Sequence, residues 1–170
     1  QTCALPISEA AALAEIDRLA AILSSYNETS EFSRWARTRN TPVRVSPELF
    51  EVLGLYDTWR VRTGGALNAA FSATPQAAAQ PHWLLNPASG TAIRLSDAPL
   101  VLNSFTKSYI IDRAANAALA HASGVVLNIG GDLAIRGRVT ETVHLANPAD
   151  ATENSAPLAH ARVANRTVAT

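Results

Sequence analysis

Residues 101–132 constrain the fold of this chain more than any other stretch. An apolar run, 99–102, leads into a polar corner, 103–109, from which a helix is predicted to run to residue 123. A second apolar run, 125–129, is predicted to be a buried strand that ends in Gly-Gly-Asp. Backbone N–H groups, a lysine and a carboxylate thereby come to the ends of neighbouring elements. A ligand that carries phosphates and a metal ion requires this combination.

Composition narrows the class of protein. The 170 residues are enough for one domain with a real core, and we expect residues 1–170 to form a single domain. Acidic and basic residues balance at 14 each, without a basic stripe, so we expect no nucleic-acid partner. No apolar run approaches the ~20 residues that cross a bilayer. The one cysteine, Cys3, excludes an internal disulfide.

Local signals predict an α+β fold, with helices packed on a largely antiparallel sheet. Ser8 is predicted to cap the first helix, and Ser46 with Pro47 to open a later one. The predicted helices cover 8–25, 30–35, 46–63 and the stretch from the corner to 123. The predicted strands cover 83–85, 91–95, 99–102, 125–129, 133–136, 139–146 and 161–169. Residues 74–81, rich in Ala, Gln and Pro, are predicted to be a flexible surface segment.

Six blocks, in order along the chain, resemble the ApbE family of FAD:protein FMN transferases. They are the first helix with Ser24-Ser25-Tyr26 and the turn Ser30-Glu31-Phe32-Ser33, the helix start Val43-Arg44-Val45-Ser46-Pro47-Glu48-Leu49, the loop Thr63-Gly64-Gly65-Ala66-Leu67-Asn68, the corner 103–109, Asn128-Ile129-Gly130-Gly131-Asp132, and the terminal Val168-Ala169-Thr170. Each block alone is a weak signal, whereas six in family order are a strong one. The resemblance implies an ApbE-type, T-fold-like domain, and we expect the chain to be incomplete at both ends.

The resemblance implies a Mg²⁺-dependent enzyme that transfers FMN from FAD to a threonine or serine hydroxyl of a partner flavoprotein and releases AMP. The reaction is attack on a pyrophosphate, where catalysis depends on positioning and charge neutralisation. Hydrolysis of FAD to FMN and AMP is a closely related outcome. The family also implies a periplasmic or cell-envelope location, with membrane contact only through an N-terminal anchor preceding Gln1.

Site positions follow from the matching motifs. The residues that match cofactor contacts are Tyr26, Ala66, Leu67, Asn68, Val101, Lys107, Gly130, Gly131 and Asp132. Ser104 matches a metal-ligand position and would act through its backbone carbonyl. The family's other metal ligands lie in a His-x-x-Asp-Pro-x-Thr-Gly segment, which we expect downstream of Thr170. Mg²⁺ needs near-octahedral oxygen ligation, so the 170 residues alone are expected to be inactive.

At two positions the sequence departs from the family motifs, and these departures leave a non-catalytic FAD-binding protein as an open alternative. Val101 stands where the family has aspartate, and Asn68 keeps an acceptor but loses the carboxylate charge. Simpler interpretations also stay open. Lys107 could be a solvated cation, although a helix N-terminus disfavours positive charge unless an anion is near. Gly130-Gly131-Asp132 could be only a turn, and Tyr26 a packing residue. The four histidines lack metal-ligand spacing and are interpreted as structural or surface residues.

Overall fold

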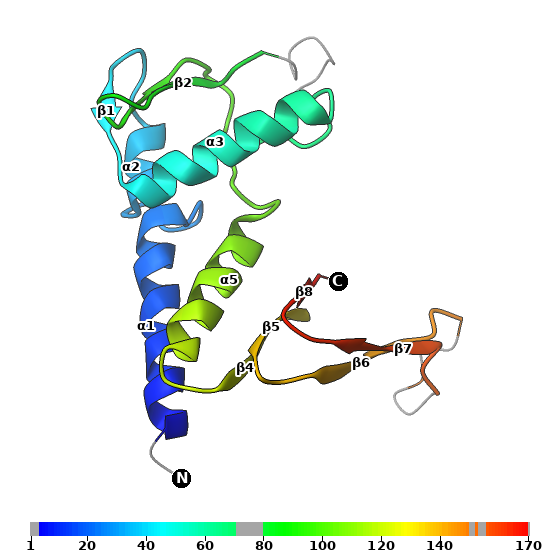
Figure 1. The fold of residues 1–170 in the computed structure, drawn as a ribbon. Coiled ribbons are helices and arrows are strands. Elements are labelled where there is room, and N and C mark those ends of the chain that lie inside the picture. The colour runs from blue at the N-terminus through cyan, green and yellow to red at the C-terminus, as the bar shows by residue number, and fades with distance from the viewer. Residues whose placement is uncertain (1–3, 71–79, 150–151, 153–155, 170) are drawn as a thin grey trace. The chain divides into compact units, whose positions relative to one another are not determined.

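The computed structural model describes residues 4–70, 80–149, 152 and 156–169 (Figure 1). The chain divides into two compact units: Asp17–Lys107, and Gln1–Ile16 together with Ser108–Thr170. We refer to them as the 17–107 unit and the 108–170 unit. That residues 1–170 act as a single domain stays a prediction. The predicted surface segment 74–81 falls almost entirely outside the described residues.

The first helix, α1, covers Ala4–Leu23, so the predicted cap at Ser8 is wrong. The helix starts one turn earlier, and Ser8 lies inside it. Proline is tolerated there because first-turn N–H groups have no partner within the helix, so Pro6 does not delay the start. The helix also ends before Ser25, whose side chain is used elsewhere in the fold.

Two further helices of the 17–107 unit start as their local signals predict. Helix α2 (Glu31–Ala36) is capped by Ser30, whose Oγ accepts a hydrogen bond from the Ser33 N–H. Helix α3 (Pro47–Arg62) is capped by Ser46, with Pro47 in its first turn. The predicted apolar stripe of α3 is buried, and it consists of Leu49, Val52, Leu53 and Tyr56. The cap residues and the 3.6-residue periodicity therefore predict both helices correctly.

A small antiparallel sheet belongs to the same unit, in the order β1-β3-β2. Its strands are β1 (Val43–Arg44), β2 (Trp83–Asn86) and β3 (Thr91–Arg94). The Trp35 indole N–H donates to the Ala92 carbonyl over 3.2 Å, and the Trp35 and Trp83 rings meet edge to face with centroids 6.0 Å apart. These buried rings join α2 to the sheet.

The predicted strand 99–102 is wrong. Only an isolated bridge between Ala70 and Leu100 forms there. Pro99 has no N–H to donate to a ladder, and the N–H of Leu102 donates to a serine side chain instead of a neighbouring strand. The segment is therefore an extended connection, held by separate hydrogen bonds to different elements.

Helix α5 (Thr106–Leu119) leads into the 108–170 unit, where it packs on the sheet β4-β5-β8. Its strands are β4 (Gly124–Ile129), β5 (Asp132–Gly137) and β8 (Thr167–Val168). Ile111 and Ala115 of α5 are buried against Ala134 of β5. The predicted buried strand is only half buried, because β4 alternates between its faces and Val126 is 40% exposed.

The predicted strand 161–169 is two strands, β7 (Ala159–Val163) and β8. Asn165 separates them with a φ of 51°, a left-handed conformation that asparagine tolerates, and its Oδ1 accepts from the Gly137 N–H over 2.8 Å. Strand β7 pairs instead with β6 (Glu141–Leu145) as a two-stranded ribbon. Because the chain turns at Asn165, β7 and β8 belong to two different sheets and do not form one continuous strand.

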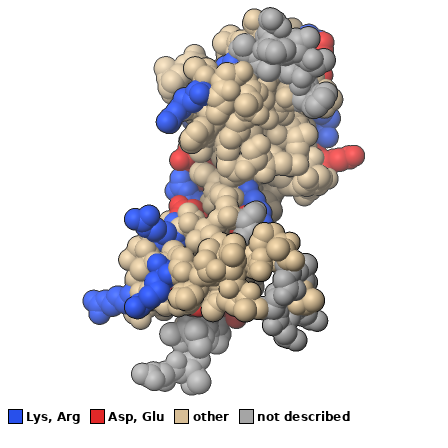
Figure 2. All heavy atoms as spheres, turned by 90° about the vertical axis from the view of Figure 1, so that its right-hand side faces the viewer, with Lys and Arg blue, Asp and Glu red and all other residues tan. Residues whose placement is uncertain are grey.

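The α+β prediction is confirmed: every strand pairing among the described residues is antiparallel, with helices packed on the sheets. No described helix is both long enough and apolar enough to cross a membrane. On the face that Figure 2 shows, acidic and basic side chains are scattered among larger areas of other residues, and no continuous basic band crosses it.

Candidate functional site

The predicted lysine corner is held in place by backbone hydrogen bonds to segments far away in sequence. The Val101 N–H donates to the Ala69 carbonyl over 2.7 Å. The next N–H, that of Leu102, donates to Ser25 Oγ over 3.0 Å. Since Ala69 follows the Gly-Gly-Ala loop and Ser25 precedes Tyr26, these two bonds place three predicted site segments side by side within the 17–107 unit.

The tip of the corner is fixed by two tyrosines. The Ser104 N–H donates to the buried Tyr56 hydroxyl over 3.0 Å, and the Asn103 side-chain amide donates to the Tyr26 hydroxyl over 2.9 Å. Burial raises the pKa of Tyr56, while the hydrogen bond from Ser104 opposes that rise. Tyr56 therefore stays a neutral phenol at physiological pH and accepts from the corner.

Tyr26 is not a packing residue, because its side chain is 81% exposed. The turn around it is nevertheless ordered. Ser24 Oγ accepts from the N–H groups of Tyr26 and Asn27, over 3.2 and 3.1 Å. An exposed aromatic ring on an ordered turn, with its hydroxyl hydrogen-bonded to Asn103, is a preorganised surface for stacking a planar ligand.

The Gly-Gly loop is the C-terminal cap of α3. The Gly65 N–H donates to the Arg60 carbonyl over 2.8 Å and the Gly64 N–H to the Val61 carbonyl over 3.3 Å, which is the Schellman pattern. Both glycines have positive φ, 61° and 89°, which other residues rarely adopt. Thr63 Oγ1 then accepts from the Leu67 N–H over 2.9 Å. The loop therefore leaves the helix in one defined direction, with Ala66 exposed.

Asn68 ends this loop and is half buried. Its Oδ1 lies 3.3 Å from the Ala70 N–H, which donates to it, and 2.9 Å from Nε2 of the buried His82. Sequence reasoning missed this partner, since His82 precedes β2 by one residue and no spacing marks it. It also missed Tyr56 and Asn103, whose roles depend on contacts across the fold.

Lys107 is exposed in the first turn of α5, which carries no acidic residue. Thr106 precedes it and is buried, with 7% of its surface exposed. The N–H groups of a first helical turn have no acceptor within the helix. A helix start with a lysine and a buried hydroxyl suits an anionic ligand.

The Gly-Gly-Asp motif is a hairpin turn in the 108–170 unit. Gly130 and Gly131, with φ of 56° and 90°, join β4 to β5, and Ile129 pairs with Asp132. The Gly131 N–H donates to Asn128 Oδ1 over 3.1 Å. The motif thus forms a hairpin turn, while a ligand role for these residues remains a prediction. Lys107 belongs to the other unit, so its convergence with this turn also stays a prediction.

The chain contains no ready metal centre among its described residues: no three His, Cys, Asp or Glu side chains are grouped to hold an ion. Ser104 can offer a carbonyl oxygen, which is one of about six ligands that Mg²⁺ requires. The described residues therefore do not by themselves fit the ion.

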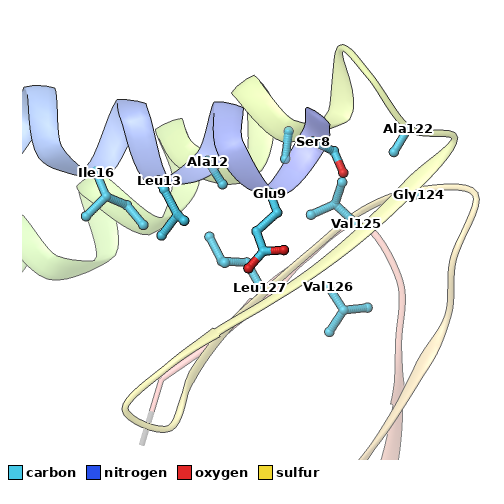
Figure 3. A pocket seen from close by; sticks show the side chains of 11 residues that line it. Ser8, Glu9, Ala12, Leu13, Ile16, Ala122, Gly124, Val125, Val126 and Leu127 are labelled. Carbon is cyan, nitrogen blue, oxygen red and sulfur yellow. The ribbon is translucent and has the colours of Figure 1, made fainter. Parts of the chain in front are cut away.

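A hollow of about 480 Å³ lies between α1 and β4 in the 108–170 unit (Figure 3). Apolar side chains line it, including Ala12, Leu13 and Ile16 of α1, and the Glu9 carboxylate extends toward Leu127. None of the predicted site residues lines this hollow. Because it lacks basic side chains, it does not suit a pyrophosphate.

Comparison with known proteins decides the family. The ApbE family profile matches residues 2–170, nearly the whole chain. This chain belongs to the ApbE family. The predicted family membership is thereby confirmed.

Solved ApbE proteins share the fold at low sequence identity. The ApbE protein of Thermotoga maritima matches with a TM-score of 0.76 and 17% sequence identity. The matched region covers 95% of this chain and 61% of the Thermotoga maritima protein. The flavinyl transferase ApbE of Pseudomonas stutzeri matches with a TM-score of 0.67 and 16% sequence identity, and the matched region covers 82% of this chain and 54% of that protein. The flavin transferase ApbE of Vibrio cholerae matches with a TM-score of 0.60 and 20% sequence identity, and the matched region covers 79% of this chain and 55% of that protein. No protein with a curated function matches in sequence. The chain thus spans 54–61% of the length of these three structures.

Proposed function

We propose that the complete gene product containing this chain transfers FMN from FAD to a threonine or serine hydroxyl of an acceptor flavoprotein. The hydroxyl oxygen forms a bond to the FMN phosphorus, the pyrophosphate bond to AMP breaks, and AMP leaves as the hydroxyl gives up its proton. Membership of the ApbE family supports flavin transfer. A periplasmic or cell-envelope location is part of the proposal.

One observation carries the proposal for this chain. Backbone N–H groups of the corner donate hydrogen bonds to Ala69, Ser25 and Tyr56, and these bonds bring three predicted site segments side by side in the 17–107 unit. The exposed ring of Tyr26 would stack on a ring of FAD, and the start of α5 with Lys107 would hold the anionic pyrophosphate. These residues bind and orient FAD, and orientation is a large share of the catalysis of phosphoryl transfer.

Mg²⁺ dependence belongs to the proposal as well. A bound Mg²⁺ would neutralise charge on the pyrophosphate, with the Ser104 carbonyl as one ligand. Because the described residues do not supply the remaining ligands, no step of the mechanism is assigned to the ion here.

The test is to incubate the complete gene product with FAD, Mg²⁺ and an acceptor peptide that contains threonine. Flavin fluorescence in the denatured peptide band and release of AMP are expected. AMP and FMN without labelled peptide would indicate hydrolysis instead. FAD binding without AMP would support the non-catalytic binder, which the loss of carboxylates at Val101 and Asn68 favours. Absence of FAD binding would contradict both.

Substitution of Lys107 tests the same proposal more specifically, since Lys107 is the chain's only lysine. Lys107→Ala should weaken FAD binding, while Lys107→Arg should retain most of it because the charge is kept. Arg138, an exposed cation in the 108–170 unit, is the matched control, and Arg138→Ala should bind FAD as the wild type does. Equal affinity in Lys107→Ala and wild type would remove this lysine from the site.

A further inference from the structure

His82 is buried next to the Gly-Gly loop, with 4% of its surface exposed. Its backbone is fixed by the hairpin, because its carbonyl accepts from the Leu95 N–H over 2.8 Å. Its ring Nε2 lies 2.9 Å from Asn68 Oδ1. The histidine therefore links the hairpin to the end of the loop.

The hydrogen-bond pattern fixes the tautomer of this histidine. The Ala70 backbone N–H, which can only donate, lies 3.3 Å from Asn68 Oδ1 and identifies that atom as the amide oxygen. An amide oxygen only accepts, so His82 Nε2 must carry a hydrogen and donate it. In the neutral ring the lone pair then resides on Nδ1.

Charged groups around the ring favour its neutral form. Burial lowers the pKa of His82, and the Arg60 guanidinium lowers it further, as does Arg94 more weakly. The Asp57 carboxylate, which is paired with Arg60 at 3.3 Å, acts in the opposite direction. The ring is therefore a neutral donor at physiological pH, with its Nε2–H committed to Asn68.

We infer that His82 is a positioning residue of the flavin-nucleotide site, which holds the Asn68 side chain and the end of the Gly-Gly-Ala loop in the orientation that receives FAD. This inference rests on the proposed function, since it assigns His82 to the same site. Two donors hold Asn68 Oδ1, so the amide cannot rotate without losing both bonds. Loss of the His82 donor would remove the shorter of these two bonds to Asn68 Oδ1.

The test compares His82→Leu with His82→Gln in the complete gene product, with FAD affinity measured by quenching of flavin fluorescence. Leucine removes the donor, and affinity should fall about tenfold, as for the loss of one hydrogen bond in a desolvated site. Glutamine keeps an N–H at similar reach and should restore affinity to within about threefold of wild type. His121→Leu, at an exposed position, is the control and should bind as wild type.

A second measurement does not depend on how the variants fold. In wild-type protein labelled with ¹⁵N-histidine, His82 should show the Nε2–H tautomer, and its N–H resonance should shift when FAD is added while that of His121 does not. A histidine with a purely structural role would show no shift. An Nδ1–H tautomer, an unshifted resonance, or equal affinity in His82→Leu and wild type would overturn the inference alone. Failure of the wild type to bind FAD would overturn the proposed function, and the inference with it.

Discussion

The side-chain amide of Asn103 donates a 2.9 Å hydrogen bond to the hydroxyl of Tyr26, which lies 77 residues earlier in the sequence. The bond joins the lysine corner to the turn after α1. It also orients a tyrosine whose ring is almost entirely in solvent. Exposed tyrosines contribute little to folding, so an oriented one points to binding.

Tyr26→Ala should therefore separate binding from stability. The free energy of unfolding should change by no more than about 0.5 kcal/mol, because the ring buries little surface. FAD affinity should fall roughly threefold to tenfold through lost stacking. Thermal unfolding and flavin fluorescence titration measure the two quantities. Unchanged FAD affinity in Tyr26→Ala would contradict the stacking role of this ring.

Tyr56→Phe should show a different pattern. The ring stays buried against Phe105, at a centroid distance of 4.1 Å, but the Ser104 N–H loses its acceptor. We expect a cost of about 1 kcal/mol in the free energy of unfolding, measured by urea denaturation, together with weaker FAD binding because the corner loosens. An unchanged urea midpoint would mean that water replaces the hydroxyl without cost.

Two glycines with similar backbone angles should respond very differently to alanine. Gly137 has a φ of +80°, and a Cβ there would lie 2.5 Å from the Ser123 carbonyl oxygen and 2.7 Å from Leu119 Cδ1. Gly90 has a φ of +63° with nothing within 4 Å. Gly90→Ala should cost roughly 1 kcal/mol of backbone strain, and Gly137→Ala roughly 3 kcal/mol or more because steric overlap is added. Equal urea midpoints for the two variants would contradict the packing between β5 and the end of α5.

The stability of the protein should fall as the pH drops below about 6.5. Because the folded-state pKa of His82 lies below its ordinary value of 6.5, the unfolded chain binds more protons in that window, and acid favours unfolding. Asp57 acts oppositely at lower pH, since burial raises its pKa above the ordinary 3.8 and the folded chain then holds the extra proton. Urea unfolding from pH 7.5 to 5.5 should show the first effect in wild type and lose it in His82→Gln. His121→Gln is the control, and a slope that persists in His82→Gln would assign the effect to another group.

Local sequence signals predicted the parts of this fold that depend on local physics. Ser46 followed by Pro47 marks a helix start because its side chain satisfies an N–H that the helix leaves open. The Gly-Gly pairs mark positive φ at a helix end and at a hairpin turn. Two strand predictions went wrong where a distant partner decides: the Leu102 N–H donates to Ser25 Oγ, and Asn165 Oδ1 accepts from the Gly137 N–H.

The candidate site shows the same division. Family motifs predicted Tyr26, the Gly-Gly loop and the corner, and the 17–107 unit brings these segments together through hydrogen bonds that the sequence does not display. Tyr56 looked like one more apolar position on α3, and His82 like any structural histidine. Their contacts with Ser104 and Asn68 depend on packing between α3, the hairpin and the corner, which no local pattern encodes.

The central claim is that the lysine corner, the Tyr26 turn and the Gly-Gly loop together form one FAD-binding site within the 17–107 unit. A crystal structure of the complete gene product with FAD tests it most directly. We expect Lys107 Nζ to lie about 3 Å from an oxygen of the FAD pyrophosphate, and the ring of Tyr26 to stack on a ring of the same FAD molecule. If FAD is bound with its phosphates away from Lys107 and its rings away from Tyr26, the account of this site is contradicted.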